Sequence, residues 1–496
     1  MTEGSDRADP GAAPSVLGLE EISRRLDRLP LCRLHAAVLT LASLSLLFDT
    51  LDIGITGFVL VVVRAIWHFG IPVIGVVSAI GLCGYLVGSF CCGFVADRIG
   101  RKKAILVTLI MYSLFSAARG LSNDIATFAA LNFFTYVFVG AESSTVPPYL
   151  AELWPAAARG KLTGWMMAFF GIGKSLAPVW IFLMIPHLGW RWALLLTAPF
   201  ALIGGVMRVA LPESPRWLLR AGRIREAEQT LASVESEVRR LTGRPLPPPR
   251  PGDCESEEGT RHAVRPRQLM SLRYRRVTGM LWTAWFAQYG VMYAFETFIP
   301  TILSSEGYSM VKSFEFSIVI YSGMIPAFIL AGRAVEWLDR KWTMLFGFGA
   351  TAVFTTLFSL ASTPAEFMLF GALATSSFAF GGTAIYTYTP ELYPTEVRAT
   401  GMGIASAWGR AGAVTLLLIF GMFFTTVGKS LLLFISDAVL LIGFIVVAWL
   451  GPPTRGRRLE DTSRGAAVNQ ERGAGTSVYN LSCSTSTSSS RSVTTF

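Results

Sequence analysis

Apolar residues fill long stretches of this chain, and short polar segments separate them. A helix needs about 20 apolar residues to cross the hydrocarbon core of a bilayer, because backbone groups without hydrogen bonds are not tolerated in lipid. Twelve stretches have a suitable length, so the pattern predicts an all-α membrane protein with twelve transmembrane helices. The stretches lie at 36–63, 73–95, 104–118, 126–148, 162–186, 192–211, 277–303, 315–335, 342–361, 367–389, 400–425 and 430–450.

Three longer polar segments flank or divide these spans. In the central one, the part from Trp217 to Leu241 has the pattern of an amphipathic helix, and a proline-rich run follows it. The last segment is rich in Ser and Thr with almost no apolar residues, so we expect it to be disordered. In chain order, the predicted units are a cytoplasmic N-terminal segment (1–35), an N-terminal six-helix bundle (36–211), a cytoplasmic central loop (212–276), a C-terminal six-helix bundle (277–450) and a cytoplasmic tail (451–496).

The basic residues indicate which side of the membrane each loop faces. If both termini are cytoplasmic, most of the 43 Lys and Arg residues lie on the inner side, as the positive-inside rule requires. We therefore expect a multi-pass plasma-membrane protein, in the inner membrane if the source is bacterial, with both termini cytoplasmic. The exceptions would be Arg64, Arg119, Arg191, Lys312 and Lys429 in outer loops and Lys174 and Arg410 within spans.

Composition excludes several other classes of protein. Of the 496 residues, 52% are hydrophobic and only 15% are charged, whereas soluble proteins carry about a quarter charged residues. The net charge of +10 reflects the inner loops, so it does not indicate nucleic-acid binding. The chain has no Gly-x-x-x-x-Gly-Lys nucleotide loop and no Cys-x-x-Cys pair, so we expect neither an ATP-driven pump nor a metal site. We expect a monomer that is not an enzyme and needs no cofactor.

Two motif pairs indicate an internal repeat. The loop after the second stretch reads Gly93-x-x-x-Asp97-Arg98-x-Gly100-Arg101, and the loop after the eighth reads Gly332-x-x-x-Glu336-x-x-Asp339-Arg340. Likewise Glu152-Leu-Trp-Pro155-x-x-x-Arg159 recurs as Glu391-Leu-Tyr-Pro394-x-x-x-Arg398. Both pairs are 239 residues apart, which predicts a duplicated six-span unit. The charged loops are either a latch that holds one conformation or anchors of the topology alone.

A further motif follows the sixth stretch, Pro212-Glu213-Ser214-Pro215-Arg216. With this motif and the two pairs, the chain resembles the major facilitator superfamily over roughly 36–450, and especially its sugar-porter, organic-ion-transporter and synaptic-vesicle-protein branches. The resemblance implies two pseudo-symmetric six-helix bundles that alternate access to a central site. The latch residues on this view are Gly93, Asp97, Arg98, Arg101, Glu152, Arg159, Glu213, Arg216, Glu336, Arg340, Glu391 and Arg398.

Finer segments look like bacterial nicotinate transporters and related aromatic-acid/proton symporters. They are Leu47–Gly54, Gln288–Gly290 with Phe298–Pro300, Gly307–Glu315 and Tyr388–Gly401. Two positions depart from the patterns. Sugar porters carry an arginine ten residues before Glu142, where this chain has Asn132, and Lys174 is foreign to the nicotinate-transporter pattern. A coupling mechanism that relies on the missing arginine is therefore not implied.

Seven ionisable residues lie at membrane depth, where such groups usually face a cavity or a partner. Arg410 is the first choice for a substrate carboxylate, because its planar fork matches that group; the alternative is an ion pair with Asp49 or Glu142. Lys174 and Asp437 receive no role, and Glu296 is either an entrance residue or a solvated helix end. The seven are Asp49, Asp52, Glu142, Lys174, Glu296, Arg410 and Asp437.

Three of these acids are candidates for proton coupling, because burial raises the proton affinity of a carboxylate. Asp49 and Asp52 are three residues apart and share a helix face; the alternative is that one pairs permanently with Arg410 or Lys174. Glu142 lies just before Pro147 and Pro148, which should break the hydrogen-bond ladder of its helix, and it either couples protons or pairs with Lys174.

Aromatic residues are the remaining candidates for substrate contact. On the spans that line the cavity in this superfamily, a stacked pair of aromatic side chains could sandwich a planar ring, although most such residues simply pack. Besides Arg410, the predicted substrate-binding residues are Gln288, Tyr289, Tyr293, Trp165, Tyr386 and Trp408.

The leading hypothesis is a secondary transporter that takes up a small aromatic carboxylate such as nicotinate with protons. The alternatives are a sugar or organic-cation carrier and a non-transporting binding protein on the same fold.

Overall fold

The computed structural model describes residues 18–155, 159–199, 211–248, 269–271, 274–393 and 395–454, and most of these residues are helical. The predicted tail, most of the N-terminal segment and part of the central loop lie outside the described residues. The helices are α1 (Leu19–Asp27), α2 (Arg33–Trp67), α3 (Ile71–Ile99), α4 (Arg101–Gly120), α5 (Ile125–Leu153), α6 (Arg159–Leu188), α7 (Trp190–Leu195), α9 (Pro215–Arg220), α10 (Ile224–Thr242), α11 (Arg275–Ser305), α12 (Met310–Ser322), α13 (Met324–Leu338), α14 (Arg340–Leu360), α15 (Pro364–Leu392) and α16 (Thr395–Leu450).

The predicted spans correspond to these helices. The eighth span is α12 followed by α13, and α16 contains spans eleven and twelve, which meet at the non-helical Gly428. The sixth span begins at α7, and residues 200–210 lie outside the described part of the chain. Within the described residues, nine helices are long and apolar enough to cross a membrane, with α12 and α13 counted together and α16 counted once. The prediction of an all-α membrane protein is therefore confirmed.

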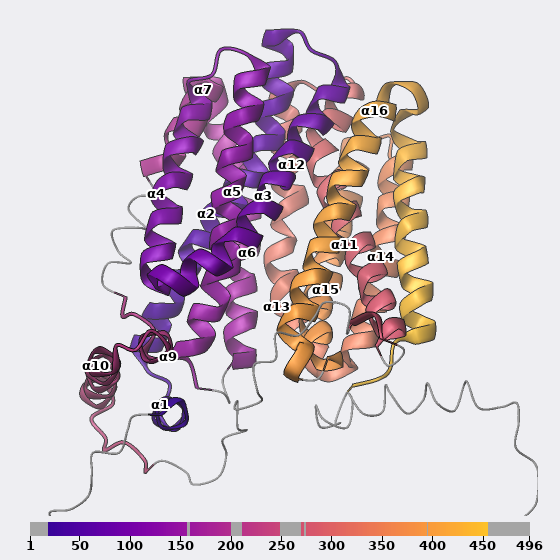
Figure 1. Ribbon diagram of the computed structural model, residues 1–496. Helices are drawn as coiled ribbons and strands as arrows, with labels where there is room; N and C mark the ends of the chain where they lie inside the picture. The colour runs from indigo at the N-terminus through magenta and orange to yellow at the C-terminus, as the bar shows by residue number, and fades with distance from the viewer. Residues whose placement is uncertain are drawn as a thin grey trace, which may run out of the picture.

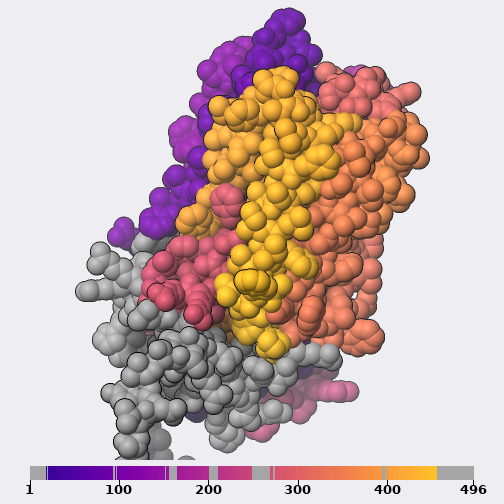
Figure 2. All heavy atoms as spheres, turned by 90° about the vertical axis from the view of Figure 1, so that its right-hand side faces the viewer, coloured from indigo at the N-terminus to yellow at the C-terminus, as the bar shows by residue number. Residues whose placement is uncertain are grey.

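The helices form two bundles that stand side by side (Figure 1). Helices α2 to α7 make up the first bundle and helices α11 to α16 the second. Helices α9 and α10 lie beyond one end of the first bundle, which we call the basic end because it carries the Arg101 loop; α7 marks the opposite end. On the face in Figure 2, the second part of α16 runs along the molecule, and exposed apolar side chains such as Ile442 and Trp449 give it a surface suited to lipid.

The two bundles repeat the same local structures at the predicted spacing. Arg101 pairs with Glu152 in the first bundle at 3.7 Å, and Arg340 pairs with Glu391 in the second at 2.9 Å. Each residue of the second pair is 239 positions after its counterpart. The backbone agrees, because the residue before each arginine has a positive φ, +102° at Gly100 and +91° at Asp339. The duplicated unit inferred from the sequence is therefore visible in the structure.

A small helical cap covers the basic end of the first bundle. Instead of the one amphipathic helix expected from Trp217 to Leu241, the chain forms α9 and α10, separated by Gly222 with φ of +76°. Helix α1, which the sequence did not predict, packs on them: Ile22 and Leu26 join an apolar cluster with Leu231. This cap is further held by Arg25, whose guanidinium donates to Glu235 at 2.6 Å.

Glycines allow close approach of α3 and α5, and this approach positions the central site. A Cβ at Gly88 would lie 1.7 Å from the carbonyl oxygen of Val137, and one at Gly140 would lie 2.1 Å from that of Tyr85. Only glycine fits at such contacts, as in other tightly packed membrane helices. The approach brings the Tyr85 hydroxyl to within 2.5 Å of the Ser143 hydroxyl.

The bundles touch each other mainly toward the opposite end. Gly75, near the start of α3, packs against Gly421 of α16, and a Cβ at Gly75 would lie 2.9 Å from the Gly421 Cα. In the same half of the molecule, Gly57 of α2 meets the backbone of Thr297 in α11. The bundles are therefore closed against each other at this end.

Candidate functional site

The central feature is a guanidinium enclosed by tyrosine side chains. Arg410 is 4% exposed, and its Cζ lies 4.4 Å, 5.0 Å and 5.4 Å from the ring centroids of Tyr85, Tyr289 and Tyr293. Its Nη2 donates to the Tyr85 hydroxyl at 3.1 Å, whereas Nε and Nη1 have no hydrogen-bond partner in the described part of the chain. Tyr386 completes the group, with its ring edge-on to Tyr289. We call these four tyrosines the tyrosine cage.

Both bundles build the cage. Tyr85 comes from α3 of the first bundle, and Arg410 from the middle of the first part of α16. Tyr289 and Tyr293 are one turn apart on α11, so they present their rings on the same helix face. Trp285 stacks on Tyr289 with centroids 5.1 Å apart and fixes its own ring by donating to the Thr389 hydroxyl. The cage is thus preorganised.

The structure brings together four of the seven predicted substrate residues: Arg410, Tyr289, Tyr293 and Tyr386. Trp408 is 40% exposed and stacks on Trp282, and Trp165 is 60% exposed, so neither belongs to the cage. Gln288 is buried, and its side-chain amide donates a hydrogen bond to the backbone carbonyl of Phe378 that joins α11 to α15. The Oε1 atom of Gln288 has no hydrogen-bond partner among the described residues.

Sequence reasoning missed Tyr85. The available signal was a single tyrosine within the small and aliphatic residues of the second span, Gly84-Tyr85-Leu86-Val87-Gly88. Such a residue gives no hint of its partner, because the cage forms only when the two bundles meet.

Arg119 is the centre of a buried polar network, which corrects its assignment to an outer loop. It is fully buried in the last turn of α4, and its Nη2 donates to both carboxylate oxygens of Asp52, at 2.6 Å and 2.5 Å. Its Nη1 donates to Asn132 Oδ1 at 2.8 Å and to the Thr56 hydroxyl at 2.9 Å. The Ser116 hydroxyl donates to Asp52 as well. The suggestion that Asp52 pairs with Arg410 or Lys174 is therefore wrong.

The other two candidate coupling acids are also buried, with Asp49 2% exposed and Glu142 fully buried. Both lie in electrostatic reach of the Tyr112 hydroxyl, as does Asp52. Helix α5 continues through Pro147 and Pro148 to Leu153, so the two missing N–H donors interrupt its hydrogen-bond ladder without ending the helix. Their lost N–H donors are tolerated within it.

Lys174 and Glu296 form an ion pair between the bundles. The Lys174 Nζ of α6 lies 2.5 Å from the Glu296 Oε2 of α11, and the side chains are 2% and 4% exposed. Glu296 is therefore not a solvated helix end, and Lys174 does not pair with Glu142. The Lys174 ammonium also lies 5.3 Å from the Tyr293 ring centroid, so the pair adjoins the tyrosine cage.

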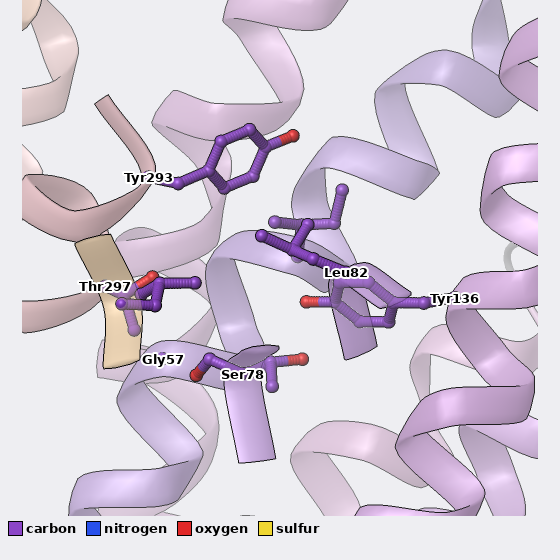
Figure 3. Close-up of a pocket in the computed structure, with 9 residues that line it drawn as sticks. Gly57, Ser78, Leu82, Tyr136, Tyr293 and Thr297 are labelled. Carbon is purple, nitrogen blue, oxygen red and sulfur yellow. The ribbon is translucent and has the colours of Figure 1, made fainter. Parts of the chain in front are cut away.

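A small cavity of about 10 Å³ lies beside Tyr293 toward the opposite end (Figure 3). It has room for about one water molecule. Helices of both bundles line it, through Gly57, Ser78 and Tyr136 on one side and Thr297 on the other. The packing is therefore almost complete on this side of the cage.

The chain matches the family described as "Sugar (and other) transporter" over residues 40–465. It belongs to that family, within the major facilitator superfamily. The chain is 32% identical over 447 residues to the "Niacin transporter NiaP" of Acinetobacter baylyi, covering 89% of this chain and 99% of that protein. It is 29% identical to the "Gallate transporter" of Pseudomonas putida, covering 81% of this chain and 88% of that protein.

Solved structures share the major facilitator fold. The inward open conformation of the xylose transporter XylE from E. coli aligns with a TM-score of 0.69 at 17% identity, covering 87% of this chain and 99% of that chain. This likeness confirms the predicted major facilitator fold of two six-helix bundles, and the family shows that the chain is a transporter of small molecules.

Arg119 contacts a position at which this chain departs from the sugar-porter pattern. Sugar porters have an arginine at the position of Asn132, and in this transporter the guanidinium of Arg119 reaches that side chain from the neighbouring helix α4. A guanidinium thus contacts the side chain at this position, although it comes from α4.

The charged loops at the basic end hold several of the predicted latch contacts. Besides the Arg101 and Arg340 ion pairs, Glu213 accepts a hydrogen bond from the backbone N–H of Lys102 at the start of α4, at 3.1 Å. Arg398 donates to the carbonyl oxygen of Tyr393, and Arg216 is buried. Glu336 and Arg98 are exposed, whereas the latch residues in these contacts are partly or fully buried. The side chains of Asp97 and Arg159, and the surroundings of Gly93, lie outside the described residues.

Asp437 has a local explanation. Its carboxylate accepts hydrogen bonds from the hydroxyls of Thr355 and Thr356 on α14. The residue therefore joins α14 to the last span within the second bundle, away from the cage.

Proposed function

We propose that this transporter takes up a small aromatic carboxylate such as nicotinate by proton symport with alternating access. The observation that carries the proposal is Arg410, a buried guanidinium that is surrounded by tyrosine side chains and has no carboxylate partner among the described residues. A buried charge is costly unless it is paired, and a carboxylate supplies the missing charge and acceptors.

The cage adds selectivity for a planar ring. Tyr289 and Tyr293 present aromatic faces beside the guanidinium, and aromatic pairs gain about 0.5–1.5 kcal/mol beyond their buried area. Niacin and gallate, which the names of two relatives specify, are both aromatic carboxylic acids. In this proposal, the ring stacks in the tyrosine cage while Arg410 holds the carboxylate.

The proton carriers in the proposal are Asp49 and Glu142, with Asp52 as the third candidate. A buried carboxylate favours its neutral form, which suits proton uptake on one side and release on the other. All three lie near Tyr112 in the first bundle, so protonation there would act on the bundle that supplies Tyr85 to the cage.

The proposal also sets the sidedness. The basic end faces the cytoplasm, both termini lie there, and the protein works as a monomer in the plasma membrane. Because the bundles are closed toward the opposite end, the structure then corresponds to an inward-facing state, in line with its likeness to the inward open xylose transporter.

Uptake of labelled nicotinate into proteoliposomes, with the outside more acidic, tests the proposal. Arg410→Gln should lower the kcat/KM for uptake about 100-fold, because charged hydrogen bonds contribute roughly 1.5–3 kcal/mol each. Arg333→Gln, at an exposed position of α13, is the matched control and should transport normally. Nicotinate uptake unaffected by Arg410→Gln would overturn the assignment.

A thermal-shift screen of the purified protein tests the alternatives. The proposal expects stabilisation by aromatic carboxylates. Stabilisation by sugars or organic cations only would support a carrier of those compounds, and nicotinate binding without flux would indicate a binding protein.

A further inference from the structure

Two buried cations lie against the same tyrosine ring. The Lys174 ammonium is 5.3 Å from the centroid of Tyr293, and the Arg410 Cζ is 5.4 Å from it. Their separation is therefore no greater than the sum of these two distances. The residues come from different bundles, Lys174 from α6 and Arg410 from α16. Any anion bound in the tyrosine cage lies close to both.

The charges of these two cations are compensated differently. Lys174 donates to Glu296 Oε2 at 2.5 Å, so its charge is neutralised by the protein. Arg410 contacts a hydroxyl and aromatic rings, and no carboxylate of the described residues lies within ion-pair distance of it. The region around Tyr293 therefore carries one uncompensated positive charge rather than two.

The Lys174–Glu296 pair is held in place by its surroundings. The Ser175 hydroxyl on α6 donates to the backbone carbonyl of Tyr321 on α12, at 2.8 Å. The Tyr321 hydroxyl in turn donates to the backbone carbonyl of Glu296, at 3.1 Å. Helices α6, α11 and α12 are thus tied together around the pair, which fixes the backbone from which the Glu296 side chain extends toward Lys174.

We propose that Glu296, by neutralising Lys174, restricts the substrate to aromatic monocarboxylates and excludes aromatic dicarboxylates. This inference rests on the proposed function of the tyrosine cage. A substrate with one carboxylate matches the single free charge of Arg410. A second carboxylate near Lys174 would meet the charge of Glu296, and juxtaposed like charges in a desolvated site cost several kcal/mol. Glu296 thus occupies the place that a second substrate carboxylate would need.

The test compares binding of nicotinate with binding of benzene-1,3-dicarboxylate and pyridine-2,3-dicarboxylate to the purified protein by calorimetry. Wild type should bind nicotinate at least tenfold more tightly than either dicarboxylate. Glu296→Gln should reverse or abolish this preference, because Lys174 then offers a free positive charge. The double variant Lys174→Gln/Glu296→Gln should restore the preference for nicotinate, since a second carboxylate would then be buried with no free cation to pair with.

A matched control lies nearby. Glu306 pairs with Lys429 at 2.8 Å outside the cage, so Glu306→Gln should leave the preference between mono- and dicarboxylates unchanged. An unchanged preference in Glu296→Gln, or the same gain of dicarboxylate binding in the double variant, would overturn the inference.

A further variant keeps the test decisive if Glu296→Gln does not fold. Lys174→Gln leaves the Glu296 charge uncompensated beside the cage, so nicotinate should bind about tenfold more weakly; wild-type affinity in this variant would contradict the inference. Failure of the proposed function looks different, because wild type would then bind neither nicotinate nor the dicarboxylates.

Discussion

The buried pair of Asp52 and Arg119 offers a sharp test of the energetics in the first bundle. Both side chains are fully buried, and the guanidinium donates to both carboxylate oxygens. Asp52→Asn keeps the shape but leaves the charge of Arg119 buried and unpaired. Breaking a buried pair in this way costs about 3–5 kcal/mol.

The expected loss is large enough to measure by thermal unfolding. For a unit of 150–250 residues, 1 kcal/mol shifts Tm by roughly 2–4 °C, so Asp52→Asn should lower Tm by roughly 6–20 °C. The fluorescence of the chain's 13 tryptophans reports the transition in detergent. Glu237→Gln, which breaks the exposed pair with Arg240, is the control and should cost less than about 1 kcal/mol.

A double-mutant cycle separates the pair from its neighbours. Asp52→Asn/Arg119→Gln removes both charges, so it should recover most of the stability lost in either single variant. If the Tm of Asp52→Asn lies within about 1 °C of the wild-type Tm, the loss in free energy of unfolding is well under 1 kcal/mol by the same scaling. That result would refute the claim that the variant leaves a costly unpaired charge. So would a double variant that is as unstable as the two single changes added together.

The same double variant tests Asp52 as a proton carrier. If Asp52 couples transport to protons, the folded double variant should exchange labelled nicotinate for unlabelled nicotinate across the membrane but fail to accumulate it in a pH gradient. Accumulation at the wild-type level would leave Asp49 and Glu142 as the coupling candidates.

Three further outcomes are expected. Burial raises the pKa of Glu235, but hydrogen bonds from its two arginine partners outweigh this effect, so its pKa is lowered in the folded protein. The contact of α10 with α1 is therefore stabilised above the unfolded pKa of about 4.3, and this stabilisation is lost as the pH falls through the lower folded pKa. Hydrogen exchange in α1 should rise in that pH range, and Glu235→Gln should abolish this pH dependence. Gly421→Ala should lower nicotinate uptake several-fold by holding the bundles apart, because its Cβ would lie 3.0 Å from a glycine Cα of α3. The control is Gly403→Ala, where a Cβ would have no atom within 4 Å, and this variant should take up nicotinate normally. Tyr85→Phe removes the hydroxyl that orients Arg410 and should raise the KM for nicotinate about tenfold, since one hydrogen bond to a charged group contributes about 1.5 kcal/mol.

Hydropathy determined most of the fold from the sequence alone, because a lipid environment leaves the backbone few options besides a helix of sufficient length. The predicted spans correspond to helices, and the 239-residue offset that predicted a duplicated unit also relates the ion pairs of Arg101 and Arg340. The failures within the fold were local. Helix α1 is short and polar on one face, so only its packing against α9 and α10 makes it evident.

The sequence by itself identified seven buried charges, since a charged residue in an apolar stretch is conspicuous, but it missed Arg119 at the end of a span. It could not assign their partners: Arg119 meets Asp52 across 67 positions, and Lys174 meets Glu296 across 122. Helical periodicity relates residues only a few positions apart, whereas the choice between acids on different helices depends on how the bundles pack. Only the tertiary structure therefore decided that Arg410 faces tyrosines instead of a carboxylate, and the proposed substrate site depends on that result.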